Sequence, residues 1–365
     1  MKFTVFPDSL NKVLAGAGRI PPSRTTLPVL STLHLVANDG LVRVEATNLE
    51  IGVGFLVGAN TETNGECCVP AKTLIDWVAT ASTDKEIQFS YNPEKAVLNL
   101  KQGKSKAEVK CIDPTEFPIV KLDMPENVVT FPADTLRKVV KEVVISVATD
   151  ESRPTLTGVH FMVKDGNVTL EGADGFRLSR SAFGYETDWA GDVIIPARGL
   201  TEFLHSVEGD EVTVGVRENQ VVFSGNNLTL VSQLIEGNYP DVNAIVPTSH
   251  KTRVVLSTKG LVQSVKAAMV FARESNNTIR LNFKDNRVTV SAVSAETGNN
   301  DSEVSATITG ANVEIAVNGK YLLEALSVHG ENTVIELNEN SNPIVVRDTE
   351  NTGLIQIVMP MHMGR

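Results

Sequence analysis

Apolar and polar residues alternate along many short segments of this chain, and three of these segments have the pattern of a β-hairpin. The three segments are residues 33–44, 159–170 and 281–290, and their central pairs are Asp39-Gly40, Asp165-Gly166 and Asp285-Asn286. Asp-Gly and Asp-Asn pairs tolerate the left-handed backbone that a tight hairpin turn needs. The pattern therefore predicts three antiparallel hairpins of the same kind.

Apolar residues at helical spacing occur in six other segments, two for each hairpin. The first segment of each pair carries the apolar stripes Leu10-Val13-Leu14, Leu136-Val139-Val140 and Leu261-Val265-Ala268. The second carries Leu74-Trp77-Val78, Leu200-Phe203-Leu204 and Leu322-Ala325-Leu326. Spacings of three and four residues place such side chains on one face of a helix. We therefore expect six short amphipathic helices with one core-facing stripe each.

The second helix of each pair belongs to a sequence repeat. Residues 69–77 (VPAKTLIDW) recur as 195–203 (IPARGLTEF) and, less clearly, as 317–325 (VNGKYLLEA), 126 and then 122 residues apart. A period of this length indicates a repeated domain, because solenoid units repeat every ~20–50 residues. We predict an α+β fold of three similar modules, each with two helices packed on antiparallel sheets, over residues 1–125, 126–249 and 250–365.

Composition narrows the class of protein. The chain has 365 residues, of which 42% are hydrophobic and 21% charged, which suits domains with real cores. Cys67, Cys68 and Cys111 form no metal-binding spacing, the histidines form no paired-ligand motif, and no apolar run approaches the ~20 residues of a membrane span. We expect a cytoplasmic protein with no membrane partner, no metal and no cofactor.

The distribution of charge matters more than its total of −11. The six predicted helices and their flanks are net basic, with clear acids on the same faces only at Asp76, Glu142, Glu202 and Glu324. Their basic residues are Lys12, Arg19, Arg24, Lys72, Arg137, Lys138, Lys141, Arg198, Lys259, Lys266, Arg273 and Lys320. Exposed basic side chains often only solvate an outer face. Equivalent basic faces in three repeats of an acidic chain favour a shared anionic ligand, such as a phosphate backbone contacted without regard to sequence.

With these features in place, the chain resembles the bacterial DNA polymerase beta sliding clamps over its whole length. The resemblance rests on residues 1–5 (MKFTV), 24–30 (RTTLPVL), 173–178 (ADGFRL), 239–241 (YPD) and 358–361 (VMPM), together with the two Pro-Ala-Lys/Arg helices. It implies a non-catalytic processivity factor built from three tandem clamp domains, two chains of which close head to tail into a six-domain ring around duplex DNA. The implied partners are duplex DNA, the replicative DNA polymerase, the clamp loader and other proteins that carry a clamp-binding motif.

The resemblance also implies three sets of site residues. The DNA-facing set is Lys12, Arg19, Arg24, Lys72, Arg137, Lys138, Lys141, Arg153, Arg198, Lys259, Lys266 and Lys320. A cleft for an extended peptide of the Gln-Leu-x-Leu-Phe kind should use Leu156, Ala173, Gly175, Phe176, Arg177, Leu178, Pro240, Ile245, Pro343, Ile357, Met359, Pro360 and Met361. Ring closure should use Ala107, Val109, Val270 and Phe271. Ala173, Phe176 and Asn243-Ala244 depart from the residues common in the family, which puts the peptide preference in question.

Two other classes of protein remain as alternatives. One is an enzyme that uses a cleft near Asp174, Arg177 and His160, although no nucleophile and base stand together in the sequence. An Asp174–Arg177 pair in a turn and a histidine repeated at positions 34 and 160 fit structural roles better. The other is a scaffold of repeats that binds only proteins. The cleft residues also have a simpler interpretation, as an inter-domain core beside a glycine turn.

Overall fold

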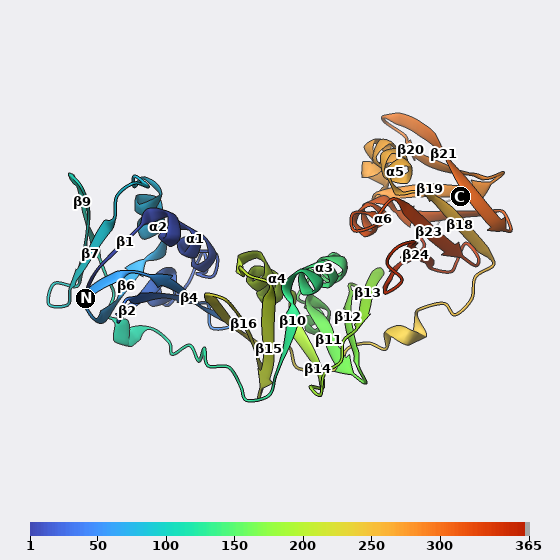
Figure 1. Ribbon diagram of the computed structural model, residues 1–365. Helices are drawn as coiled ribbons and strands as arrows, with labels where there is room; N and C mark the ends of the chain where they lie inside the picture. Colours follow the sequence, from blue (N-terminus) through green and yellow to red (C-terminus); the bar gives the residue numbers. More distant parts are fainter. Residues whose placement is uncertain (362–365) are drawn as a thin grey trace. The chain divides into compact units, whose positions relative to one another are not determined.

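The computed structural model describes residues 1–361, and within them the helices lie close to the predicted positions (Figure 1). The α-helices are α1 (Pro7–Ala17), α2 (Ala71–Ala79), α3 (Ala133–Val144), α4 (Ala197–Ser206), α5 (Thr258–Ala272) and α6 (Gly319–Leu326). Short 3₁₀ turns are η1 (Pro28–Ser31), η2 (Pro114–Glu116), η3 (Pro154–Thr157), η4 (Val242–Ala244) and η5 (Arg273–Ser275). The predicted apolar stripes are buried, except that Trp77 is half-buried.

The chain divides into two compact units, one made of residues 1–136 and 198–234 and the other of residues 137–197 and the chain from 235 onwards. The first unit has a five-stranded antiparallel sheet in the order β5-β1-β7-β8-β9. Its strands are β1 (Lys2–Val5), β5 (Asn60–Thr63), β7 (Ile87–Asn92), β8 (Val97–Gln102) and β9 (Ser105–Lys110).

An eight-stranded sheet, in the order β10-β15-β16-β17-β4-β3-β2-β6, completes the first unit. Its strands are β2 (Thr32–Asn38), β3 (Leu41–Thr47), β4 (Ile51–Gly58), β6 (Gly65–Pro70), β10 (Val128–Pro132), β15 (Glu211–Arg217), β16 (Gln220–Gly225) and β17 (Leu228–Gln233). The pairing of β4 with β17 joins strands of the first and central modules, from Leu228 opposite Phe55 to Ser232 opposite Ile51.

The second unit is built on a twelve-stranded sheet in the order β14-β11-β12-β13-β25-β24-β23-β18-β21-β20-β19-β22. Its strands are β11 (Gly158–Lys164), β12 (Asn167–Ala173), β13 (Arg177–Gly184), β14 (Gly191–Pro196), β18 (Thr252–Ser257), β19 (Thr278–Lys284), β20 (Arg287–Ser294), β21 (Gly298–Gly310), β22 (Val313–Asn318), β23 (Asn332–Leu337), β24 (Ile344–Asp348) and β25 (Leu354–Val358). Helices α5 and α6 pack together, with α5 on β20 and β21, over a core rich in Val, Leu and Ile (Figure 1).

The three predicted hairpins are confirmed as β2–β3, β11–β12 and β19–β20. Both central residues of each turn have positive φ: 45° and 86° at Asp39 and Gly40, 50° and 72° at Asp165 and Gly166, and 52° and 55° at Asp285 and Asn286. Two left-handed residues in succession define the turn whose twist matches that of the flanking strands. The local sequence of each repeat is therefore sufficient to fix its register.

Candidate protein-binding cleft and nucleic-acid interface

The end of the described chain is held by main-chain pairing at the junction of β13 and β25. Arg177 is opposite Val358 and Leu178 is opposite Ile357, and the Met359 amide donates to the Phe176 carbonyl at 2.9 Å. Beyond the strand, the Met361 amide donates to the Ala316 carbonyl of β22 at 2.8 Å. Chain termini usually fray unless they are tied down, and these bonds hold the Met-Pro-Met segment on residues of β22 and of the turn before β13.

A small apolar cluster lies at this junction, separate from the large core of the third module. Its buried members are Ala148, Leu156, Ala173, Leu178, Val242 and Ile357, with Tyr239 and Val246 packed against them. Four of these are predicted cleft residues from segments far apart in the sequence: Leu156, Ala173, Leu178 and Ile357. Three other predicted cleft residues expose large apolar side chains, namely Phe176 (61%), Ile245 (41%) and Met359 (37%). Solvent-exposed apolar side chains in one small region mark an interaction site more often than scattered ones do.

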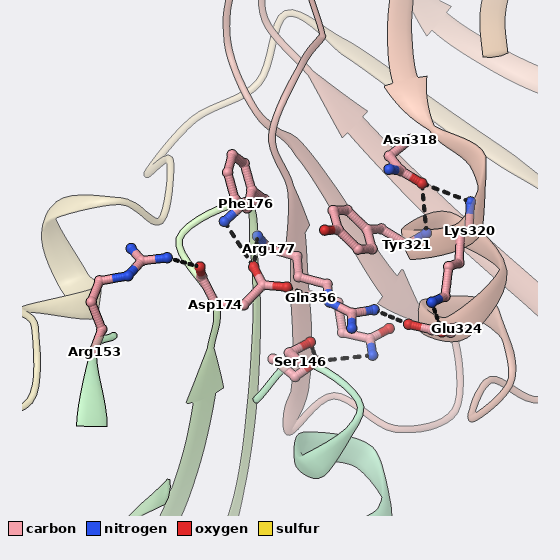
Figure 2. A network of polar contacts seen from close by, with 11 residues as sticks. Ser146, Arg153, Asp174, Phe176, Arg177, Asn318, Lys320, Tyr321, Glu324 and Gln356 are labelled. Atoms are coloured by element: carbon pink, nitrogen blue, oxygen red, sulfur yellow. Dashed lines mark hydrogen bonds and ion pairs between the residues drawn. The ribbon is translucent and has the colours of Figure 1, made fainter. Parts of the chain in front are cut away.

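The turn between β12 and β13 is held by hydrogen bonds, and its geometry requires glycine at position 175. Asp174 accepts hydrogen bonds at Oδ1 from the amides of Phe176 (2.8 Å) and Arg177 (3.0 Å), as Figure 2 shows. Gly175 has φ +90°, and a Cβ there would lie 2.5 Å from Arg153 Nη1. The Arg153 guanidinium also donates to the Asp174 carbonyl at 2.6 Å. Arg153, which we predict in the DNA-facing set, is solvent-exposed and packs on this turn, where Gly175 leaves room for its side chain.

Arg177 is held inside the second unit. Its Nε donates to Asp174 Oδ2 at 3.0 Å, its Nη1 pairs with Glu324 of α6, and its guanidinium lies 4.4 Å from the centre of the Tyr321 ring (Figure 2). Only 12% of the Arg177 side chain is exposed. The predicted Asp174–Arg177 structural pair is present, and Arg177 joins β13 to α6. The sequence gives no signal for its partner Tyr321, since the two residues are distant in the chain.

A chain of buried and partly buried side-chain hydrogen bonds runs through the same junction. It links Ser146 to Ser179 (2.7 Å), Ser179 to Gln356 (3.2 Å), Gln356 to His329 (2.8 Å), His329 to Thr333 (3.2 Å) and Thr333 to Thr258 (2.8 Å). Burial lowers the pKa of His329, so its ring is neutral near pH 7. A buried polar chain is favourable only when every member is satisfied, so it fixes one arrangement of the strands it connects.

Residues 239–246 lead from the central module to the third and form the second linker; residues 117–123 are the first linker, between the first and central modules. The second linker is held on the sheet of the second unit by His160 and Arg180. The Tyr239 ring stacks on His160 with 4.7 Å between ring centres, and Arg180 donates to Asn243 Oδ1 at 2.9 Å. His160 lies between two carboxylates, Nδ1 at 3.0 Å from Glu171 and Nε2 at 2.7 Å from Asp192. Burial lowers the pKa of His160, but the hydrogen bonds and charges of these two carboxylates raise it more, so it lies above the usual value. The predicted structural role of this histidine fits these contacts.

One cavity borders the second linker, and another borders the residues that follow it. One, of about 440 Å³, is lined by His160, Tyr239, Pro240 and neighbouring side chains of β11–β13. The other, of about 240 Å³, is lined by residues 247–250 together with Pro343, Glu336 and Arg347. The predicted cleft residues Pro240 and Pro343 therefore line cavities, whereas Leu156 and Ile357 are buried in the cluster. Val242 and Tyr239 of the cluster were missed by sequence reasoning, although the repeated aromatic-Pro pairs Phe117-Pro118 and Tyr239-Pro240 mark the place.

The basic residues of the helices and their flanks are exposed, with the exception of Arg137. Lys72, Lys138, Lys141, Lys259 and Lys266 are solvent-exposed, as are Lys12, Arg19, Arg24, Arg198 and Lys320, whereas Arg137 is half-buried. Some of this charge is neutralised within the chain: Arg19 Nε lies 2.6 Å from Glu202 Oε2, and Lys12 Nζ lies 3.4 Å from Glu208 Oε1. Pairs of this kind reduce the positive field that the helices present.

Glu142 was wrongly expected among the acids of the exposed helix faces. It is 2% exposed, accepts a hydrogen bond from the Ser181 hydroxyl at 2.6 Å, and accepts another from the Asn351 amide at 2.9 Å. Burial raises the pKa of Glu142 above its usual value. The face of α3 is therefore more basic than the sequence alone suggests, and Glu142 joins α3 to the loop before β25.

The residues expected at ring closure differ in exposure. Val270 on α5 is 58% exposed and Phe271 is half-buried, while Val109 on β9 is only 7% exposed and its strand neighbour Ala107 is half-buried. Strand β9 is an edge strand of the five-stranded sheet. Its unpaired main-chain groups are available to another strand.

Within residues 1–361, no group of three or more His, Cys, Asp or Glu side chains is placed to hold a metal ion. In the same described part of the chain, none of the helices combines the length and apolar character needed to cross a bilayer.

The chain matches, in consecutive segments, the three domain families of the DNA polymerase III beta subunit: the N-terminal domain over residues 1–122, the central domain over 130–241 and the C-terminal domain over 243–362. It is 26% identical to the beta sliding clamp of Bacillus subtilis (strain 168) over 99% of both chains, and 27% identical to that of Synechococcus elongatus over the whole of both. Among solved structures, the DNA polymerase sliding clamp of Bacillus subtilis gives a TM-score of 0.94 at 25% identity over 100% of both chains. A sliding clamp of Pseudomonas aeruginosa bound to griselimycin gives the same score, identity and coverage. Three tandem clamp domains account for the repeats, the helices and the sheets alike, and the chain therefore belongs to the beta subunit family of DNA polymerase III, the sliding clamps, whose members are non-catalytic processivity subunits.

Proposed function

We propose that two copies of this chain close head to tail into a ring around duplex DNA, and that the ring tethers the replicative polymerase through a short peptide bound at the β13–β25 junction. The observation that carries the proposal is the set of exposed side chains of Phe176, Ile245 and Met359 beside a buried apolar cluster. An extended peptide with apolar anchors covers such side chains, and rigid backbone under them lowers the entropy lost on binding.

The basic helix faces support the DNA part of the proposal. Lys138 and Lys141 on α3, and Lys259 and Lys266 on α5, are exposed on helices of a chain with a net charge of −11. Dispersed lysines give a sequence-independent attraction to phosphates that weakens with salt. This suits a protein that must remain on DNA while moving along it, because strong local contacts would oppose sliding.

Ring closure and the other partners follow from the same proposal. Exposed Val270 on α5 and the edge strand β9 offer an apolar contact and an unpaired strand edge for a second copy of the chain. The clamp loader and other proteins with a clamp-binding motif would use the same cleft, and the cytoplasm is the proposed location. The domain boundaries that we propose are 1–125, 126–249 and 250–365.

Fluorescence anisotropy with a labelled Gln-Leu-x-Leu-Phe peptide tests the cleft. Ile245→Ser and Met359→Ser each remove an exposed apolar side chain without touching the main-chain pairing, so each should weaken binding about tenfold, or ~1.4 kcal/mol. Val293→Ser is the matched control, because Val293 is 68% exposed elsewhere in the second unit. Saturable binding that is equally strong in all four proteins would refute the proposed cleft.

Retention on circular DNA separates a clamp from a scaffold that binds only proteins. After loading, intact clamps should remain on a closed circle and leave when the circle is cut. Replacing Lys138 and Lys141 by Glu should lower retention and leave peptide affinity unchanged. Unchanged DNA association in this variant would favour the scaffold.

A further inference from the structure

The chain contains two junctions of the same construction, and the segment that leads into each linker is held in the same way. The Ile112 amide donates to the Cys68 carbonyl of β6, and the Ile235 amide donates to the Ile194 carbonyl of β14, both at 2.9 Å. Each linker then packs an aromatic ring against the histidine of its module. The Phe117 ring is tilted by 38° against His34 at 4.8 Å, and the Tyr239 ring is stacked on His160 at 4.7 Å. The adjacent strand pairs also correspond, β4 with β17 in the first unit and β13 with β25 in the second.

The two junctions differ at two strand positions. In the first, Gly52 is opposite Thr47 and Gly54 is opposite Glu45; in the second, the corresponding residues are Leu178, opposite Ala173, and Arg180, opposite Glu171. Strand β4 thus has no side chains at the two positions where β13, at the second junction, has the large side chains of Leu178 and Arg180. A glycine in a strand often marks a place where another part of the chain approaches closely.

The first linker, residues 117–123, makes that close approach. A Cβ on Gly52 would lie 2.4 Å from Val120 Cγ1, and a Cβ on Gly54 would lie 2.3 Å from Leu122 Cδ1. Arg217 of β15 holds the linker in place by donating to the carbonyls of Lys121 and Asp123, the latter at 2.9 Å. The side chains of Val120 and Leu122 therefore lie directly on the surface of β4. They fit there only because positions 52 and 54 are glycines, since a Cβ at either position would collide with them.

We propose that the first linker is an internal ligand: Val120 and Leu122 occupy a groove equivalent to the peptide cleft and confine peptide binding to the second junction. The latent groove would accept the same class of ligand, a short extended peptide with apolar anchors. This inference rests on the proposed function only for the ligand that it names; the occupation of the groove by the linker is independent of it. Gly52 and Gly54 are then specificity-determining residues. They allow the first linker to fill the groove at the first junction, so that each chain has one peptide-binding site although the junction is repeated.

The test converts the first junction towards the second. Gly52→Leu introduces the residue that stands at the corresponding position 178 and should displace Val120. Gly58→Leu is the matched control on the same strand, since a Cβ at Gly58 meets nothing within 4 Å. Arg217→Gln is a second variant, which loosens the linker without adding bulk. Trypsin cleavage after Lys121, followed by mass spectrometry, reports release of the linker, and calorimetry with the Gln-Leu-x-Leu-Phe peptide reports the number of sites.

We expect cleavage after Lys121 to accelerate about tenfold in Gly52→Leu and in Arg217→Gln, but not in Gly58→Leu, because proteolysis follows the population of the opened segment. Peptide stoichiometry should rise from one towards two per chain in Gly52→Leu. Faster cleavage with a stoichiometry of one overturns the latent groove. Unchanged cleavage in both variants overturns the role of the linker. Absence of peptide binding by the unmodified chain would instead contradict the proposed function and leave the cleavage result to decide the linker's role.

Discussion

Replacing Arg177 by Ala should destabilise the junction between β13 and α6 more than any other single change in a polar contact there. The substitution removes the hydrogen bond to Asp174, the ion pair with Glu324 and the contact with the Tyr321 ring. The side chain is 12% exposed, so these contacts are partly shielded from water. A hydrogen bond to a charged group contributes about 1.5–3 kcal/mol, and a cation–π contact about 0.5–1 kcal/mol.

The expected loss of unfolding free energy is smaller than the sum of these contributions, because Asp174 and Glu324 keep other partners. Asp174 keeps two backbone amide donors, and Glu324 still has Lys320 at 3.9 Å, so neither carboxylate loses every partner. We therefore expect a loss of about 3 kcal/mol rather than the upper end of the range for breaking a buried pair, ~3–5 kcal/mol. In a double-mutant cycle with Glu324→Gln, the coupling energy should be about 1–2 kcal/mol.

Urea unfolding gives the change in free energy, and hydrogen exchange of the β25 amides locates it in the structure. Arg287→Ala is the control, because the Arg287–Glu303 pair at 3.0 Å has side chains 54% and 57% exposed and should contribute at most ~0.5 kcal/mol. A loss below ~1 kcal/mol for Arg177→Ala, or a coupling energy near zero, would refute this assignment of Arg177 as the link between β13 and α6.

Three further predictions follow from single contacts. Because its folded-state pKa is raised, His160 stabilises the protein fully below the unfolded value of ~6.5 and loses that contribution as pH rises through the folded value; His160→Gln should remove this part of the pH dependence of urea unfolding. Gly353→Ala should cost ~2 kcal/mol or more in urea unfolding, because a Cβ there would lie 2.1 Å from the Ala182 carbonyl oxygen, whereas Gly184→Ala has no atom nearer than 4.0 Å and should change little. Glu142→Gln should flatten the fall in stability as pH rises above ~4.3, since ionisation of this buried carboxyl is disfavoured in the folded chain; an unchanged pH profile would contradict its burial.

Local patterns in the sequence were sufficient to predict the helices and hairpins of each module. The Asp-Gly and Asp-Asn pairs specified their hairpins because the turn depends only on the φ of two adjacent residues. The apolar stripes specified the helices because a buried face repeats with the helical period. Equivalent positions in the repeats also identified His34 and His160 as structural residues, since both lie between the same kinds of carboxylate.

The sequence by itself determined the three-module plan, the secondary structure of each module, and four of the six buried residues in the apolar cluster at the β13–β25 junction. Only the tertiary structure decided that Glu142 is buried, that Arg153 packs on the Gly175 turn, that Arg177 reaches Glu324, and that Val120 and Leu122 cover Gly52 and Gly54. Each of these depends on a contact between residues far apart in the chain. A periodic pattern reports which face of an element is buried, whereas the partner across a sheet junction is set by how modules join, which no local pattern contains.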